Sequence, residues 1–113
     1  MNGQPGKLLR LYVNEHDEYG GKPLYEAIVD RCRELKVAGV TVFRALEGFG
    51  DTAELHHQHL FHSDQPIVIT IVERPEKAQQ TLPVLESMMN SGVIAITDVE
   101  VTLVSKGART DLV

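Results

Sequence analysis

Apolar residues recur with a period of two in four segments of the chain, the pattern typical of β-strands. We expect strands at residues 7–13, 40–47, 67–72 and 93–104. In the first of them, Leu9, Leu11 and Val13 share one side, whereas the second and third carry apolar residues on both alternating sides. In the fourth, Asp98 interrupts a β-branched run, which predicts a break or bulge near residues 97–98.

Two other segments show the three-to-four-residue spacing of amphipathic helices. The first begins around Pro23 and is closed by Gly39, and its apolar face is Leu24, Ile28, Cys32 and Leu35. The second begins at Pro75 and stops at Gly92, with Ala78, Leu82, Leu85 and Met89 on its apolar face. An interior proline, Pro83, predicts a bend in this helix or a helix that starts near it.

The resulting order of strand, helix, strand, strand, helix, strand predicts an α+β, ferredoxin-like βαββαβ fold, with a four-stranded antiparallel sheet and two helices on one face. The other face should carry Val68, Val72 and either Phe43 or Val42. An exposed sheet face this apolar predicts burial against further subunits, in a symmetric oligomer.

Residues 48–65 show no sustained apolar periodicity. A connection of this length is uncommon in a compact domain unless it is functional or disordered, so we interpret it as the working loop of a single domain spanning residues 1–113. The polar segment 105–113 is expected to be a flexible tail.

Composition narrows the function classes. The 113 residues carry a net charge of -5 and no long basic run, which argues against nucleic acid as a partner. No stretch is apolar enough to insert into a membrane and no secretion signal is visible, so we expect a soluble cytoplasmic protein. The single cysteine, Cys32, is interpreted as a buried packing thiol. No nucleophile motif or catalytic triad is visible, so we expect a protein that is not an enzyme.

The fold order and four short motifs together resemble the PII-like proteins of domain-of-unknown-function family 190, within the PII (GlnB-like) signalling superfamily of nitrogen regulatory proteins. The motifs are GKPLYEA at 21–27, AGVTV at 38–42, EGFG at 47–50 and LP at 82–83. The resemblance extends over roughly residues 8–104, and the loop after the second strand corresponds to the PII T-loop.

This resemblance implies a homotrimer whose three sheets face a shared centre. It also implies an adenine nucleotide bound in the clefts between subunits, and a loop that regulates a protein target such as a membrane transporter. The candidate ligand-binding residues are Gly48, Phe49, Gly50, Lys106 and Arg109. Glycines at the first and third of these positions allow main-chain N–H groups to approach an anion closely.

The chain departs from PII proteins where they place lysines before and in the third strand. Here Pro66, Ile67 and Val68 occupy that region. Phosphate-binding charge is therefore sparse, which favours a nucleotide less charged than ATP, or no nucleotide.

Histidines give an alternative interpretation of the loop. If the loop is helical there, His56 and His59 share a face, as do His59 and His62, and imidazoles at such spacing can bind a transition metal. The alternative is thus a divalent-metal-binding protein, similar to the trimeric CutA proteins. A pH-sensitive loop and a metabolite-independent scaffold are further hypotheses.

Overall fold

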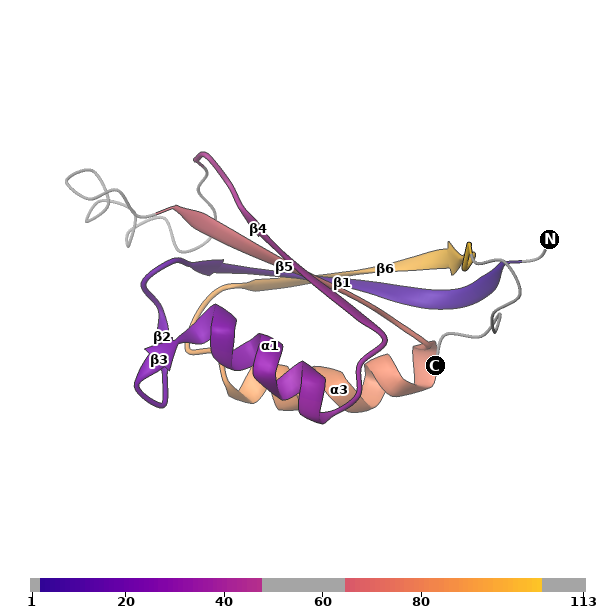
Figure 1. Cartoon of the computed structure of the whole chain (residues 1–113), viewed down its shortest axis with the longest axis horizontal. Coiled ribbons are helices and arrows are strands. Elements are labelled where there is room, and N and C mark those ends of the chain that lie inside the picture. The colour runs from indigo at the N-terminus through magenta and orange to yellow at the C-terminus, as the bar shows by residue number, and fades with distance from the viewer. Residues whose placement is uncertain (1–2, 48–64, 105–113) are drawn as a thin grey trace.

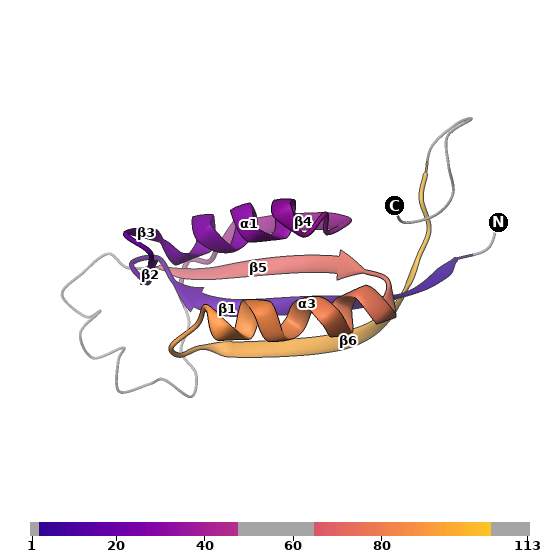
Figure 2. The same cartoon turned by 90° about the horizontal axis from the view of Figure 1, so that it is seen from below.

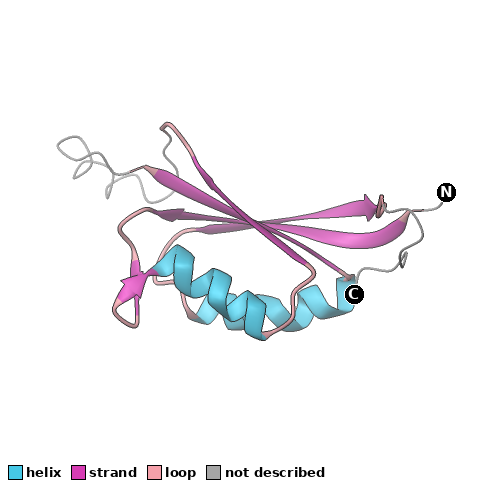
Figure 3. Ribbon diagram, in the orientation of Figure 1, coloured by secondary structure: helices cyan, strands magenta, loops and turns pink. Residues whose placement is uncertain are grey.

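The structure, a computed structural model, describes residues 3–47 and 65–104. Its elements are β1 (Gln4–Asn14), β2 (Glu18–Tyr19), β3 (Lys22–Pro23), α1 (Leu24–Glu34), β4 (Gly39–Arg44), β5 (Pro66–Glu73), α3 (Pro75–Ser87) and β6 (Val93–Val101). Four of the strands form one antiparallel sheet in the order β4-β5-β1-β6. Both helices lie on the same side of this sheet (Figure 1, Figure 3), which confirms the ferredoxin-like α+β arrangement.

The core lies between the sheet and the two helices. The central strands supply Leu9, Leu11 and Val13 from β1 and Ile67, Ile69 and Ile71 from β5, all buried. Seen from the helix side, α1 runs along the β4 and β5 half of the sheet and α3 along the β1 and β6 half (Figure 2). Burying each such aliphatic side chain contributes about 1.5–3 kcal/mol, so the helices are held mainly by this layer. Cys32 is buried within it, as expected.

A short hairpin precedes α1. Residues Gly20 and Gly21 have φ angles of 61° and 82°, and they connect β2 to β3. Two successive positive φ angles are typical of a tight hairpin turn, which explains why glycines occupy both positions. Pro23 is the N-cap residue, and α1 begins at Leu24.

The end of α1 differs from the prediction that Gly39 closes the helix. The last helical residue is Glu34, and Lys36 takes the left-handed conformation with φ 60°. The backbone N–H of Val37 donates to the Cys32 carbonyl at 3.0 Å, which is the hydrogen bond of a Schellman motif. A lysine therefore fills the position where a glycine is usual, and Gly39 instead begins β4.

The second helix begins at Pro75 and continues through Pro83, so the alternative start near Pro83 is wrong. Proline at the first helical position has its φ angle preset for the helix. Ala78 and Leu85 are buried on either side of the exposed Pro83, and this packing holds both halves of the helix against the sheet. The helix ends at Ser87, before the expected stop at Gly92.

The expected break in β6 is absent. Successive residues Thr97 and Asp98 pair with Leu8 and Lys7 without a bulge. Asp98 is accommodated because its carboxylate accepts a hydrogen bond from the Lys7 ammonium across the ladder. The strand ends at Val101, three residues before the predicted boundary.

The β4 strand is also shorter than predicted, ending at Arg44 rather than residue 47. The final backbone hydrogen bond runs from the Ala45 N–H to the Pro66 carbonyl at 2.8 Å. Pro66 has no N–H with which to continue the ladder. The chain therefore leaves the sheet here, on both sides of the loop.

Candidate functional site

The residues singled out in the sequence lie largely outside the described part of the chain. This holds for the candidate ligand-binding residues Gly48, Phe49, Gly50, Lys106 and Arg109, and for the candidate metal ligands His56, His59 and His62. The two ends of the segment that contains the loop residues are described, at Glu47 and Gln65. The part of the candidate site that the structure describes is therefore the base of the loop.

One carboxylate, that of Glu15, joins the two stems of the loop to the end of β1. Its Oε2 accepts a hydrogen bond from the Arg44 guanidinium at 2.5 Å, and its Oε1 accepts one from the Gln65 backbone N–H at 3.2 Å. The Glu15 N–H in turn donates to the Gln65 carbonyl at 3.1 Å. The Glu15 side chain is only 20% exposed, so these contacts are largely shielded from water. Together they fix where both stems leave the sheet.

The same end of β1 is tied to the start of α1. The Asn14 N–H donates to the Asp17 carboxylate at 2.9 Å, and the Asp17 N–H donates to the Asn14 carbonyl at 3.1 Å. The Asp17 carbonyl accepts a hydrogen bond from the Leu24 N–H at 2.7 Å. The loop base, the β2–β3 hairpin and the first turn of α1 thus form one hydrogen-bonded unit.

Sequence reasoning missed this unit. Glu15 and Arg44 are 29 residues apart, and Glu15 and Gln65 are 50 apart, so no local spacing reveals the contacts. The sequence held one clue, which is where the charged residues stand. Arg44 ends β4, which leads into the loop, and Glu15 directly follows β1, which pairs with β5.

A second carboxylate, Glu73, is fully buried at the opposite end of β5. Its Oε2 accepts from the Ala38 N–H and its Oε1 from the Arg74 N–H, each at 2.8 Å. Lys77 lies 3.9 Å from it. These partners satisfy the buried charge and fasten the starts of β4 and α3 to β5, so Glu73 has a structural role.

Apolar side chains line much of the helix-free face of the sheet, as predicted. Paired positions place Phe43, Val68, Tyr12 and Val93 in one row across all four strands. Phe43 is 53% exposed, Tyr12 41% and Val93 38%. Val72 lies on the same face beside Leu8, and of the two alternatives for β4 it is Phe43 that faces this side.

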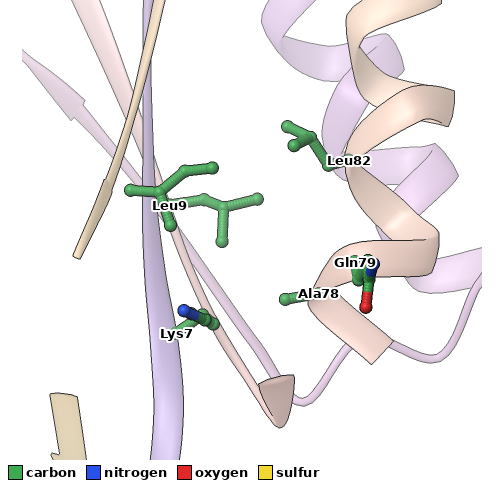
Figure 4. A pocket seen from close by; sticks show the side chains of 6 residues that line it. Lys7, Leu9, Ala78, Gln79 and Leu82 are labelled. Carbon is green, nitrogen blue, oxygen red and sulfur yellow. The ribbon is translucent and has the colours of Figure 1, made fainter. Parts of the chain in front are cut away.

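A cleft of about 260 Å³ opens on the helix side, between α3 and the β1–β6 half of the sheet. Figure 4 shows Lys7 and Leu9 of β1 facing Ala78, Gln79 and Leu82 of α3. The lining is mostly aliphatic, and the Lys7 ammonium is already paired with Asp98. The cleft therefore offers little for recognition of a charged ligand.

Within residues 3–47 and 65–104, no three His, Cys, Asp or Glu side chains gather in a group that could hold a metal ion. In the same ranges, no helix has the length and apolar character needed to cross a membrane.

Burial raises the pKa of the Cys32 thiol to about 11, consistent with a packing role.

Comparison with known proteins gives a family and a fold. The family model DUF190, described as "Uncharacterized ACR, COG1993", matches residues 6–101. The UPF0166 protein of Aquifex aeolicus (strain VF5) is 38% identical over 97 residues, which are 84% of this chain and 91% of the relative.

Solved structures of CPII from Thiomonas intermedia K12 are similar over nearly the whole chain. One, bound to ADP, AMP and acetate, matches with a TM-score of 0.60 and 24% identity over 91% of this chain and 94% of that chain. Another is described as a nitrogen regulatory PII-like protein bound to ADP, AMP and bicarbonate. It matches with a TM-score of 0.55 and 22% identity over 87% and 89% of the two chains. The fold is therefore PII-like, and by sequence the chain belongs to the DUF190 (UPF0166) family.

Proposed function

We propose that this protein is a PII-like regulatory protein that assembles as a homotrimer. The helix-free face supports the assembly, because Phe43, Val68, Tyr12 and Val93 form a continuous apolar row that a lone subunit would leave in water. In the assembly, three such faces meet at a shared centre, and the helices form the outside.

The proposed ligand is an adenine nucleotide, held in each cleft between subunits at the base of the loop. The observation that carries this proposal is the fold shared with CPII, whose structures contain ADP and AMP. The contacts expected from the PII resemblance are Gly48, Phe49, Gly50, Lys106 and Arg109. Because Pro66, Ile67 and Val68 at the start of β5 stand where PII proteins carry lysines, ADP or AMP fits this chain better than ATP.

The proposed output is regulation of a protein partner, such as a membrane transporter, through residues 48–65. Glu15 acts as a clamp through its hydrogen bonds with Arg44 and Gln65, which fix both stems of that segment to β1. Asp17 connects the same end of β1 to α1, and both sets of contacts support this role. A ligand that changes the stem geometry would then bias the conformation presented to the partner. On this proposal the protein acts in the cytoplasm and regulates rather than catalyses.

Calorimetric titration with ADP, AMP and ATP, combined with native mass spectrometry, tests the proposal. We expect a trimer that binds three molecules of ADP or AMP and binds ATP more weakly. Replacing Lys106 and Arg109 together by glutamine should weaken ADP binding by about tenfold or more, since each charge-assisted hydrogen bond contributes about 1.5–3 kcal/mol.

The matched control is Arg33→Gln, which removes a cation from the exposed face of α1 and should leave ADP affinity unchanged. A trimer that binds none of the three nucleotides would refute the ligand, and a stable monomer would refute the assembly.

A further inference from the structure

The charged residues of the sheet are distributed unevenly between its two faces. The four strands carry six charged side chains: Lys7, Arg10, Arg44, Glu73, Asp98 and Glu100. Strand pairing and the alternation of side chains place five of them on the helix side. Arg10 alone lies on the helix-free face.

Arg10 stands near the middle of that face. It belongs to β1, a central strand, and its neighbours across the ladder are Thr70 on β5 and Ala95 on β6. Both neighbours are short and uncharged. Among the described residues the Arg10 side chain makes no hydrogen bond or ion pair, whereas Lys7 and Arg44 each have a carboxylate partner.

Burial of this face would leave the guanidinium without compensation. Arginine stays protonated in proteins, and an unpaired buried charge is strongly destabilising. The strands cannot supply the counter-charge, because their three carboxylates, on Glu73, Asp98 and Glu100, all lie on the opposite face. In the proposed trimer, three such faces would meet around the three-fold axis, so the three guanidinium groups near their middles would lie close to one another and repel.

We propose that Arg10 of the three subunits together bind one small oxyanion of the phosphate class on the axis of the trimer. The planar guanidinium presents N–H groups in a fork that matches the oxygens of such an anion. Three guanidinium groups around one multivalent oxyanion would each donate hydrogen bonds to it, and its negative charge would offset the repulsion between the three positive charges. This site rests on the trimer of the proposed function and is separate from the nucleotide clefts, because it lies at the centre of the helix-free faces rather than at the loop base.

Titration of the assembled protein with inorganic phosphate, in phosphate-free buffer at constant ionic strength, tests the site. We expect one phosphate bound per trimer by native mass spectrometry, and a thermal midpoint that rises with phosphate concentration but not with chloride. A parallel titration with ADP distinguishes the axial site from the nucleotide clefts. The clefts would bind three ADP molecules per trimer, whereas the axial site would bind one phosphate per trimer.

Two variants of the same strand form the matched pair. Arg10→Met removes the charge and should abolish both phosphate binding and the phosphate-dependent rise, while keeping or increasing trimer stability without phosphate. Lys7→Met removes a cation from the helix side and should retain both phosphate effects. Should Arg10→Met not fold, Arg10→Lys takes its place: it keeps the charge but loses the fork, and its phosphate affinity should fall by about tenfold.

A trimer that binds no phosphate, binds one per subunit, or binds it equally well in the Arg10 variants overturns the axial site and leaves the proposed assembly intact. A monomeric wild-type protein overturns the assembly itself, and the axial site with it.

Discussion

Two neighbouring residues of β4, Val42 and Phe43, allow a sharp test of which sheet face mediates assembly. They belong to an edge strand, are 37% and 53% exposed, and point to opposite sides of the sheet. Val42 pairs with the buried Ile69 on the helix side, and Phe43 pairs with Val68 on the helix-free side. Phe43→Gln should therefore weaken the proposed trimer, and Val42→Gln should not.

The magnitude follows from the exposed fraction of Phe43. Complete burial of a phenylalanine side chain is worth about 1.5–3 kcal/mol, and roughly half of that remains to be gained on assembly, or about 1 kcal/mol per subunit. Three subunits give about 3 kcal/mol, which corresponds to roughly a hundredfold change in the trimer association constant. Burying the glutamine amide without a partner adds to this loss.

Sedimentation equilibrium over a range of protein concentrations measures the association constant directly, and circular dichroism checks that both variants remain folded. Equal dissociation of the two variants would refute the assignment of the interface to the helix-free face. A Phe43→Gln trimer as stable as the wild type would refute it too.

Three further predictions concern the described residues. Glu15→Ala removes the acceptor of the Gln65 N–H and should lower the free energy of unfolding by about 1–2 kcal/mol in urea titrations, with a smaller loss for Glu15→Gln, which keeps an oxygen acceptor. Gly92→Ala should lower the thermal midpoint more than Gly21→Ala. Both glycines have positive φ, at 128° and 82°, but only at Gly92 would a Cβ meet a backbone oxygen, at 2.6 Å. The pKa of Cys32 is raised from 9.0 to about 11 in the folded protein, so its contribution to stability is complete below pH 9 and is lost between pH 9 and 11. Urea titrations across that range should show a steeper fall for the wild type than for Cys32→Ala, by at most about 3 kcal/mol, and parallel curves would contradict the raised pKa.

Alternation alone was sufficient to predict the four strands of the main sheet and the core side of β1. Leu9, Leu11 and Val13 fall on one side of β1 because successive side chains of a strand point to opposite faces, and the register confirms that this side is the core. The boundaries were less predictable. Lys36 ends α1 in a conformation that usually takes glycine, and the end of β4 depends on pairing with Pro66, which is remote in sequence.

The candidate site was predictable only where it depended on local motifs. The glycine-phenylalanine-glycine segment at 48–50 was visible from sequence and stays a prediction. The clamp between Glu15 and Arg44 could not be seen, because it forms only once β1 lies next to β5 and β5 next to β4. The isolation of Arg10 likewise emerges only from the register of β1 with both its neighbours.

The proposed roles of the molecule converge on β1. Leu9 and Leu11 fix its core face, and the residues that alternate with them, Arg10 and Tyr12, are thereby committed to the helix-free face. Two residues after Val13, the same strand delivers Glu15 to both stems of the loop. A shift of β1 by one residue would bury Arg10 in the core, so the register that the core enforces also keeps the proposed subunit interface and the loop base in a fixed relation. On the proposals above, a ligand at either place would act on β1 or on a residue that it positions, so β1 is the element that would couple the proposed trimer centre to the loop base.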